Sequence, residues 1–89
     1  MPTCEISWSV NPIGNYNFQS IIDQRQQCEL VFVYADGSRS SFYCRIIAWP
    51  TGSSLRLDSP NDLLSESNGM QYGVLTLPNS DKVKFDGIA

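Results

Sequence analysis

Residues 28–44, CELVFVYADGSRSSFYC, contain two alternating apolar runs separated by a turn sequence. The letters YADG predict a three-residue hairpin loop that ends with Gly37 in the left-handed region of backbone conformation. Such a loop centres the strand pairing on Asp36 and places Cys28 directly opposite Cys44. A two-residue Asp-Gly loop would shift the register by one and divide the phenylalanines between the two faces. The hydrophobic pattern therefore favours the three-residue loop.

The predicted hairpin has one apolar face and one mixed face, because side chains alternate along a strand. The apolar face consists of Cys28, Leu30, Phe32, Phe42, Cys44, Ile46 and Ala48. The mixed face consists of Glu29, Val31, Val33, Ser41, Tyr43, Arg45, Ile47 and Trp49. The mixed face is either a second core surface, covered by another part of the chain, or an interface with a partner. The sequence leaves both interpretations open.

The rest of the chain predicts further short strands with turn residues between them. We expect these strands at residues 4–10, 54–58, 71–77 and 82–88, with turns at 11–15. Short helical turns are expected after Asn17 and in the segment capped by Ser59. The predicted fold class is mainly β: a small antiparallel barrel or sandwich of about six short strands with one or two short helical turns. We expect residues 1–89 to form a single compact β domain.

Composition and charge exclude several classes of protein. The chain has 89 residues, a net charge of −3 and six basic residues that are scattered along it, which argues against nucleic-acid binding. No apolar run approaches the length of a membrane span, so we expect no membrane partner. The N-terminus lacks the charged and apolar regions of a secretory signal. If this is the natural start of the chain, we expect a cytoplasmic protein.

The three cysteines, Cys4, Cys28 and Cys44, raise the question of a metal site, a disulfide or a reactive thiol. The chain contains no histidine and no C-x-x-C motif, so a zinc site lacks its usual ligands. The absence of histidine also removes the ordinary base of a nucleophilic cysteine or serine. With three cysteines at least one stays unpaired, and a disulfide needs an oxidising compartment. We expect all three to be buried core residues, and we expect no catalytic residue, no metal and no cofactor.

Asp58, Asp62 and Glu66 form the one local cluster of acidic residues. At four-residue spacing Asp62 and Glu66 would share one face of a helical turn, where their oxygens could bind a divalent cation. The alternative is a capped, solvated turn in which Asp62 favours the helix N-terminus and Glu66 faces water. We expect the second arrangement.

These observations favour a non-enzymatic, protein-binding module over an enzyme. We expect an accessory inhibitor or adaptor that occludes a site on another protein, a class that includes phage proteins directed at bacterial defence. The expected partner contacts are Tyr43, Arg45 and Trp49, with Asp58, Asp62 and Glu66 as a second patch.

The alternative is an oligomeric protein that binds or sequesters a nucleotide or sugar. In that case Trp8, Tyr43 or Trp49 would stack on the ligand, Arg45 or Arg56 would pair with an anionic group, and Tyr72 and Lys82 could line the same pocket. A homodimer that uses the mixed face is also compatible with the sequence.

Overall fold

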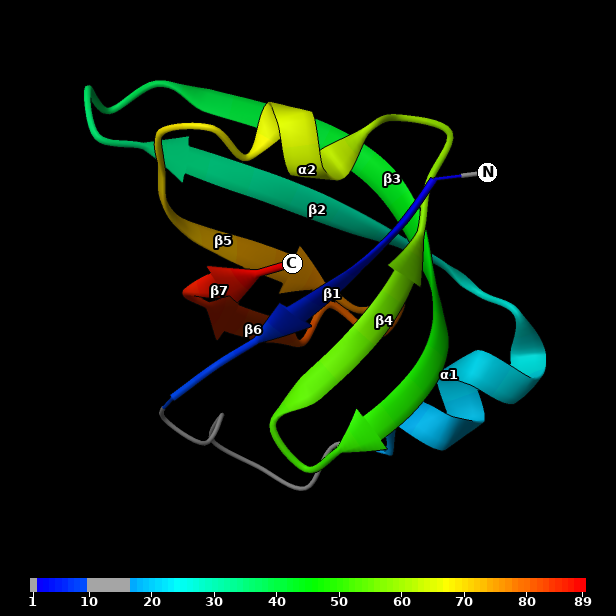
Figure 1. Ribbon diagram of the computed structural model, residues 1–89. Coiled ribbons are helices and arrows are strands. Elements are labelled where there is room, and N and C mark those ends of the chain that lie inside the picture. The colour runs from blue at the N-terminus through cyan, green and yellow to red at the C-terminus, as the bar shows by residue number, and fades with distance from the viewer. Residues whose placement is uncertain (1, 10–16) are drawn as a thin grey trace.

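The computed structural model describes residues 2–9 and 17–89, and within them seven strands and two short helices surround one hydrophobic core (Figure 1). The elements are β1 (Thr3–Ser7), α1 (Phe18–Gln24), β2 (Gln27–Tyr34), β3 (Arg39–Thr51), β4 (Ser54–Asp58), α2 (Leu63–Glu66), β5 (Met70–Thr76), β6 (Lys82–Phe85) and β7 (Gly87–Ile88). The predicted mainly β fold class is therefore confirmed. The predicted turns at 11–15, and Val10 of the first predicted strand, lie outside the described residues.

The described strands form one antiparallel sheet in the order β6-β5-β2-β3-β4-β1-β7. The sheet is open, because its two end strands, β6 and β7, do not pair with each other. These two strands are consecutive in the chain and meet at Asp86, whose N–H donates to Ser7 O at 3.2 Å. The single strand expected at 82–88 is thus split in two, because its first part pairs with β5 and its last part pairs with β1.

The register of the β2–β3 hairpin is the predicted one. Cys28 lies opposite Cys44, and the pairing continues to the turn, where Tyr34 N–H donates to Ser38 O at 2.9 Å. Gly37 has a φ of +86°, and its N–H donates to Tyr34 O at 2.9 Å. The loop therefore holds the apolar positions of both strands on one face, as the hydrophobic pattern requires.

The core is formed by this apolar face together with the inward side chains of the neighbouring strands. The largest side chains with almost no solvent exposure are Phe32, Phe85, Ile6, Leu30, Leu55, Leu57, Leu75 and Val83. Phe32 packs edge-on against Phe85, with ring centroids 6.3 Å apart. A side chain at Gly73 would collide with the Phe85 ring, so glycine is required where β5 passes this ring.

The two helices are held by side-chain caps at their N-termini. Asn17 Oδ1 accepts from Ser20 N–H at 3.2 Å and begins α1, as predicted. In α2 the cap is Asp62, whose Oδ1 accepts from Ser65 N–H at 3.4 Å. The prediction of Ser59 as the cap was wrong, because the helix begins only at Leu63; the buried Ser59 Oγ instead accepts from Asn61 N–H at 3.2 Å and donates to Tyr43 O at 2.9 Å. No helix in the described part of the chain is long and apolar enough to cross a membrane.

Replacing Gly37 with alanine should destabilise the protein by about 1–2 kcal/mol, because a left-handed backbone is costly for a residue with a Cβ. The added Cβ meets no atom within 4 Å, so backbone strain is the sole cause. Gly52→Ala is the matched control, since its Cβ also meets open space but its φ lies outside the left-handed region. Urea unfolding should show a loss in Gly37→Ala alone. Equal stability of the two variants would contradict the turn assignment.

Candidate functional site

A β-bulge near the middle of β3 decides which of its side chains share a face. Ile46 pairs with Leu57, but Ala48 pairs with Arg56, so one extra residue lies on β3 between the two pairs. Cross-strand partners point to the same face, and Arg56 is exposed on the outer face of the sheet. Ala48 therefore points outward and Trp49 points inward, which reverses the predicted alternation at both residues.

Trp49 packs against α1 as a consequence of this bulge. Its ring meets the buried Phe18 ring edge-on, with centroids 5.1 Å apart, and Phe18 also lies 6.1 Å from the Trp8 ring. The Trp49 side chain remains 37% exposed. The expectation that Trp49 contacts a partner together with Tyr43 and Arg45 stays a prediction.

The outer face of β3 before the bulge carries the most exposed aromatic side chain of the described residues. Tyr43 is 59% exposed and Ile47 is 42% exposed, with Arg45 exposed between them. We call Tyr43, Arg45 and Ile47 the β3 surface. Val33, which was predicted to lie on the same face, is only 8% exposed and lies between Arg39 and Tyr72 on the neighbouring strands. The mixed face is therefore buried at Val33, near the turn, and exposed at Glu29 and along β3.

The acidic residues lie at two different places rather than in one cluster. Asp58 ends β4 directly opposite Arg45, so one member of the acidic patch borders the β3 surface. Asp62 and Glu66 are exposed on α2, where Glu66 N–H donates to Asp62 O at 3.0 Å. Within residues 2–9 and 17–89, no group of three acidic or cysteine side chains could hold a metal ion. The cation-binding alternative for this trio has no geometric support.

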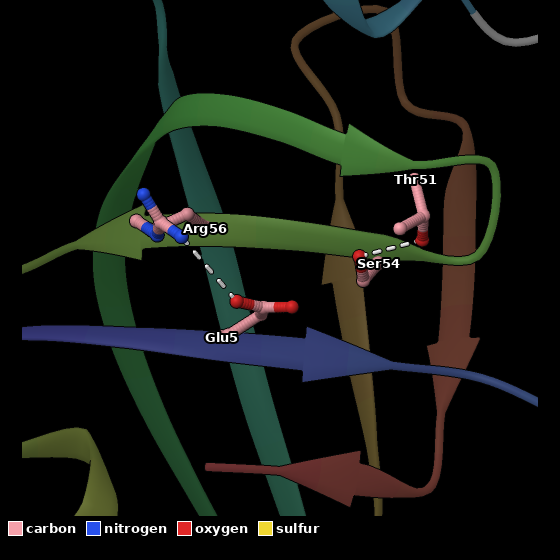
Figure 2. Close-up of polar contacts among 4 residues, drawn as sticks. All are labelled: Glu5, Thr51, Ser54 and Arg56. Carbon is pink, nitrogen blue, oxygen red and sulfur yellow. Dashed lines mark hydrogen bonds and ion pairs between the residues drawn. The ribbon is translucent and has the colours of Figure 1, made fainter.

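Two polar contacts lie next to the β3 surface, one between β1 and β4 and one in the β3–β4 turn (Figure 2). Arg56 Nη2 lies 3.6 Å from Glu5 Oε2, an exposed ion pair between cross-strand neighbours. Thr51 Oγ1 and Ser54 Oγ are 2.8 Å apart and close the turn between β3 and β4. Arg56 is thus engaged with a carboxylate of its own chain.

The side chains expected to hold a small ligand are not assembled into one pocket. Trp8 is only 5% exposed, and the ring of Tyr72 is covered by Lys84, whose Nζ lies 4.4 Å from the ring centroid. A hollow of about 460 Å³ lies elsewhere, between α1 and the β5–β6 turn. It is lined by Asn17, Ser20, Ile21, Gln26, Leu77, Pro78, Asn79 and Asp81, none of which was predicted as a ligand contact.

No protein-family model, curated protein or solved structure matches this chain.

The three cysteines are core residues, as predicted. Cys4 is 5% exposed, Cys28 and Cys44 are each 2% exposed, and all three are free thiols. Burial raises the pKa of Cys4 and of Cys28 to about 11, and it raises the pKa of Cys44 further. A thiol that resists ionisation is a poor nucleophile, so these groups act through packing.

The native thiols should therefore react slowly with maleimide at about pH 8 and rapidly after unfolding. The folded state also retains thiol protons that the unfolded chain loses above its ordinary pKa of 9.0. The free energy of unfolding should consequently fall as pH rises through the window from about 9 to about 11. Urea unfolding across this window tests the sign, and Cys28→Ala should show a smaller fall. Rapid labelling of the native protein would contradict the assignment.

Trp49→Ala should destabilise the protein by about 2 kcal/mol, because it removes a half-buried ring that packs on Phe18. Tyr43→Ala should change stability by no more than about 0.5 kcal/mol, since most of that side chain faces solvent. Thermal unfolding of the two variants beside the parent protein measures this difference. A larger loss of stability in Tyr43→Ala than in Trp49→Ala would contradict the packing of Trp49 on Phe18.

Proposed function

We propose that this protein is a non-enzymatic, protein-binding module that acts as an accessory inhibitor or adaptor by occluding a site on its partner. The observation that carries the proposal is the exposure of Tyr43 and Ile47 on either side of Arg45 on one long strand. Tyrosine and arginine are enriched at interaction hot spots, because they bury a large area and keep a polar group available for hydrogen bonding.

The position of the β3 surface within the sheet supports this role. At Arg45 the strand is paired on both sides, with Gln27 of β2 on one side and Asp58 of β4 on the other. A backbone held in this way has little conformational freedom left to lose on binding, which lowers the entropic cost of association. Arg45 and Asp58 stand opposite each other and offer both signs of charge next to the exposed Tyr43 ring.

A stable interface buries about 800 Å² on each partner, which is more than three side chains provide. The contact must therefore extend from the β3 surface onto its neighbours. Gln27 and Glu29 on β2 are exposed and lie opposite Arg45 and Tyr43. The exposed Asp62 and Glu66 of α2 are a separate acidic patch, and they supply a second contact only for a partner that also covers α2.

The test is affinity capture from a lysate of the source cells, with Tyr43→Ala and Ile47→Ala run beside the parent protein. Leu64→Ala is the matched control, because Leu64 is 43% exposed but lies on α2. We expect one partner that is recovered by the parent protein and by Leu64→Ala. Its recovery should fall about tenfold or more in the two β3 variants, as for a hot-spot residue.

Two results would count against this proposal. Equal capture by the parent protein and by both β3 variants would exclude the β3 surface as the contact. A small molecule released from the purified protein on denaturation, with no protein captured, would favour the ligand-binding alternative.

A further inference from the structure

The first part of β3 has a strand neighbour on only one side. Arg39 to Arg45 pair with β2, whereas pairing with β4 begins only at Arg45. Within residues 2–9 and 17–89, no other strand lies beside β3 before that residue. In Figure 1 this part of β3 and the turn before it project at the upper left. The sheet therefore has an open edge along Arg39–Tyr43.

The hydrogen-bond pattern shows which backbone groups face this edge. Hydrogen-bonded and non-hydrogen-bonded pairs alternate along an antiparallel ladder. Because Tyr34 bonds to Ser38, the register assigns Ser40 and Phe42 to the bonds with β2. The residues between them point their N–H and C=O groups away from β2.

The outward groups belong to Arg39, Ser41 and Tyr43. One of these backbone groups already has a hydrogen-bond partner, because Tyr43 O accepts from Ser59 Oγ at 2.9 Å. No hydrogen bond within the described part of the chain engages the outward N–H and C=O of Arg39 and Ser41. Both residues are exposed. Such a row of unpaired groups is a template for another strand.

The side chains along the edge indicate what kind of strand fits. Arg39 is its single charged residue, and the stretch from Arg39 to Tyr43 contains no proline, no inward charge and no bulge. An acidic side chain opposite Arg39 would form a favourable cross-strand pair. A second copy of this stretch has no carboxylate to place there. At the other end, exposed Tyr43 and half-buried Phe42 favour an apolar neighbour.

We propose that the partner adds an extended segment to this edge as a strand, with an acidic side chain opposite Arg39 and an apolar side chain beside Tyr43. Main-chain hydrogen bonds to Arg39 and Ser41 supply the affinity, and the alternating side chains supply the selectivity. The inference rests on the proposed protein-binding function and deepens it, because Tyr43 belongs both to the β3 surface and to the edge. The outer side chains of the added strand would extend the β3 surface.

A random linear peptide library displayed on phage is the probe, selected against the intact protein. Ser41→Pro is the decisive variant, because proline removes the outward N–H and leaves the β2 ladder bonds of Ser40 and Phe42 in place. Ser41→Val keeps the N–H and is the matched control. We expect selected peptides that share an acidic and an apolar position. Their synthetic forms should bind the parent protein and Ser41→Val alike and bind Ser41→Pro and Arg39→Glu at least tenfold more weakly.

Amide hydrogen exchange gives a readout that does not depend on how well the proline variant folds. In the free protein the amides of Arg39 and Ser41 should exchange fast and those of Ser40 and Phe42 slowly. Bound peptide should protect the amides of Arg39 and Ser41.

Failure to select any peptide, or binding that leaves Arg39 and Ser41 unprotected, would overturn strand addition. Peptides that lose binding in Tyr43→Ala but not in Ser41→Pro would overturn it too, while leaving the proposed protein-binding function intact. Self-association of the free protein that is lost in Ser41→Pro would replace the partner segment with a second copy.

Discussion

The structure depends on the register of the β2–β3 hairpin, and Gly37 fixes that register. A shift by one residue would move Leu30 and Phe32 from the core to the outer face, since successive side chains alternate. Every other strand is placed relative to this pair: β5 adds to β2 and β6 to β5, while β4 adds to β3, β1 to β4 and β7 to β1. The left-handed conformation of one glycine thus determines which apolar side chains meet in the centre of the protein.

Much of the fold could be predicted from the sequence because the strongest signals are local. The turn residues around Asp36, the alternation in SLRLD at 54–58 and the cap at Asn17 each act within a few residues. The missed features depend on contacts distant in sequence. The strand at 82–88 is divided because its two parts meet different neighbours. Ser59 is anchored to β3 through Tyr43 O, and the helix begins after it, at Leu63.

The candidate site was predictable in part for the same reason. Tyr43 and Arg45 lie before the bulge, where alternation assigns the outer face correctly, and both are exposed. Trp49 lies after the bulge, where simple alternation no longer applies, and its ring packs on Phe18 while it stays 37% exposed. The open edge at Arg39 and Ser41 had no signal in the sequence at all, because it exists only where β4 stops short of the hairpin.

The pairing of β7 with β1 also bears on the order in which the protein assembles. Glu5 and Ala89 exchange two backbone hydrogen bonds, of 2.8 and 2.9 Å, between segments from opposite ends of the sequence. Closing so long a loop in the unfolded chain carries a high entropic cost, whereas closing the β2–β3 hairpin carries a low one. We therefore expect the contact between Glu5 and Ala89 to form late on the folding pathway, after the intervening strands have brought the two segments close together. In this order of assembly the strands add outward from the β2–β3 hairpin, and β7 pairs with β1 last.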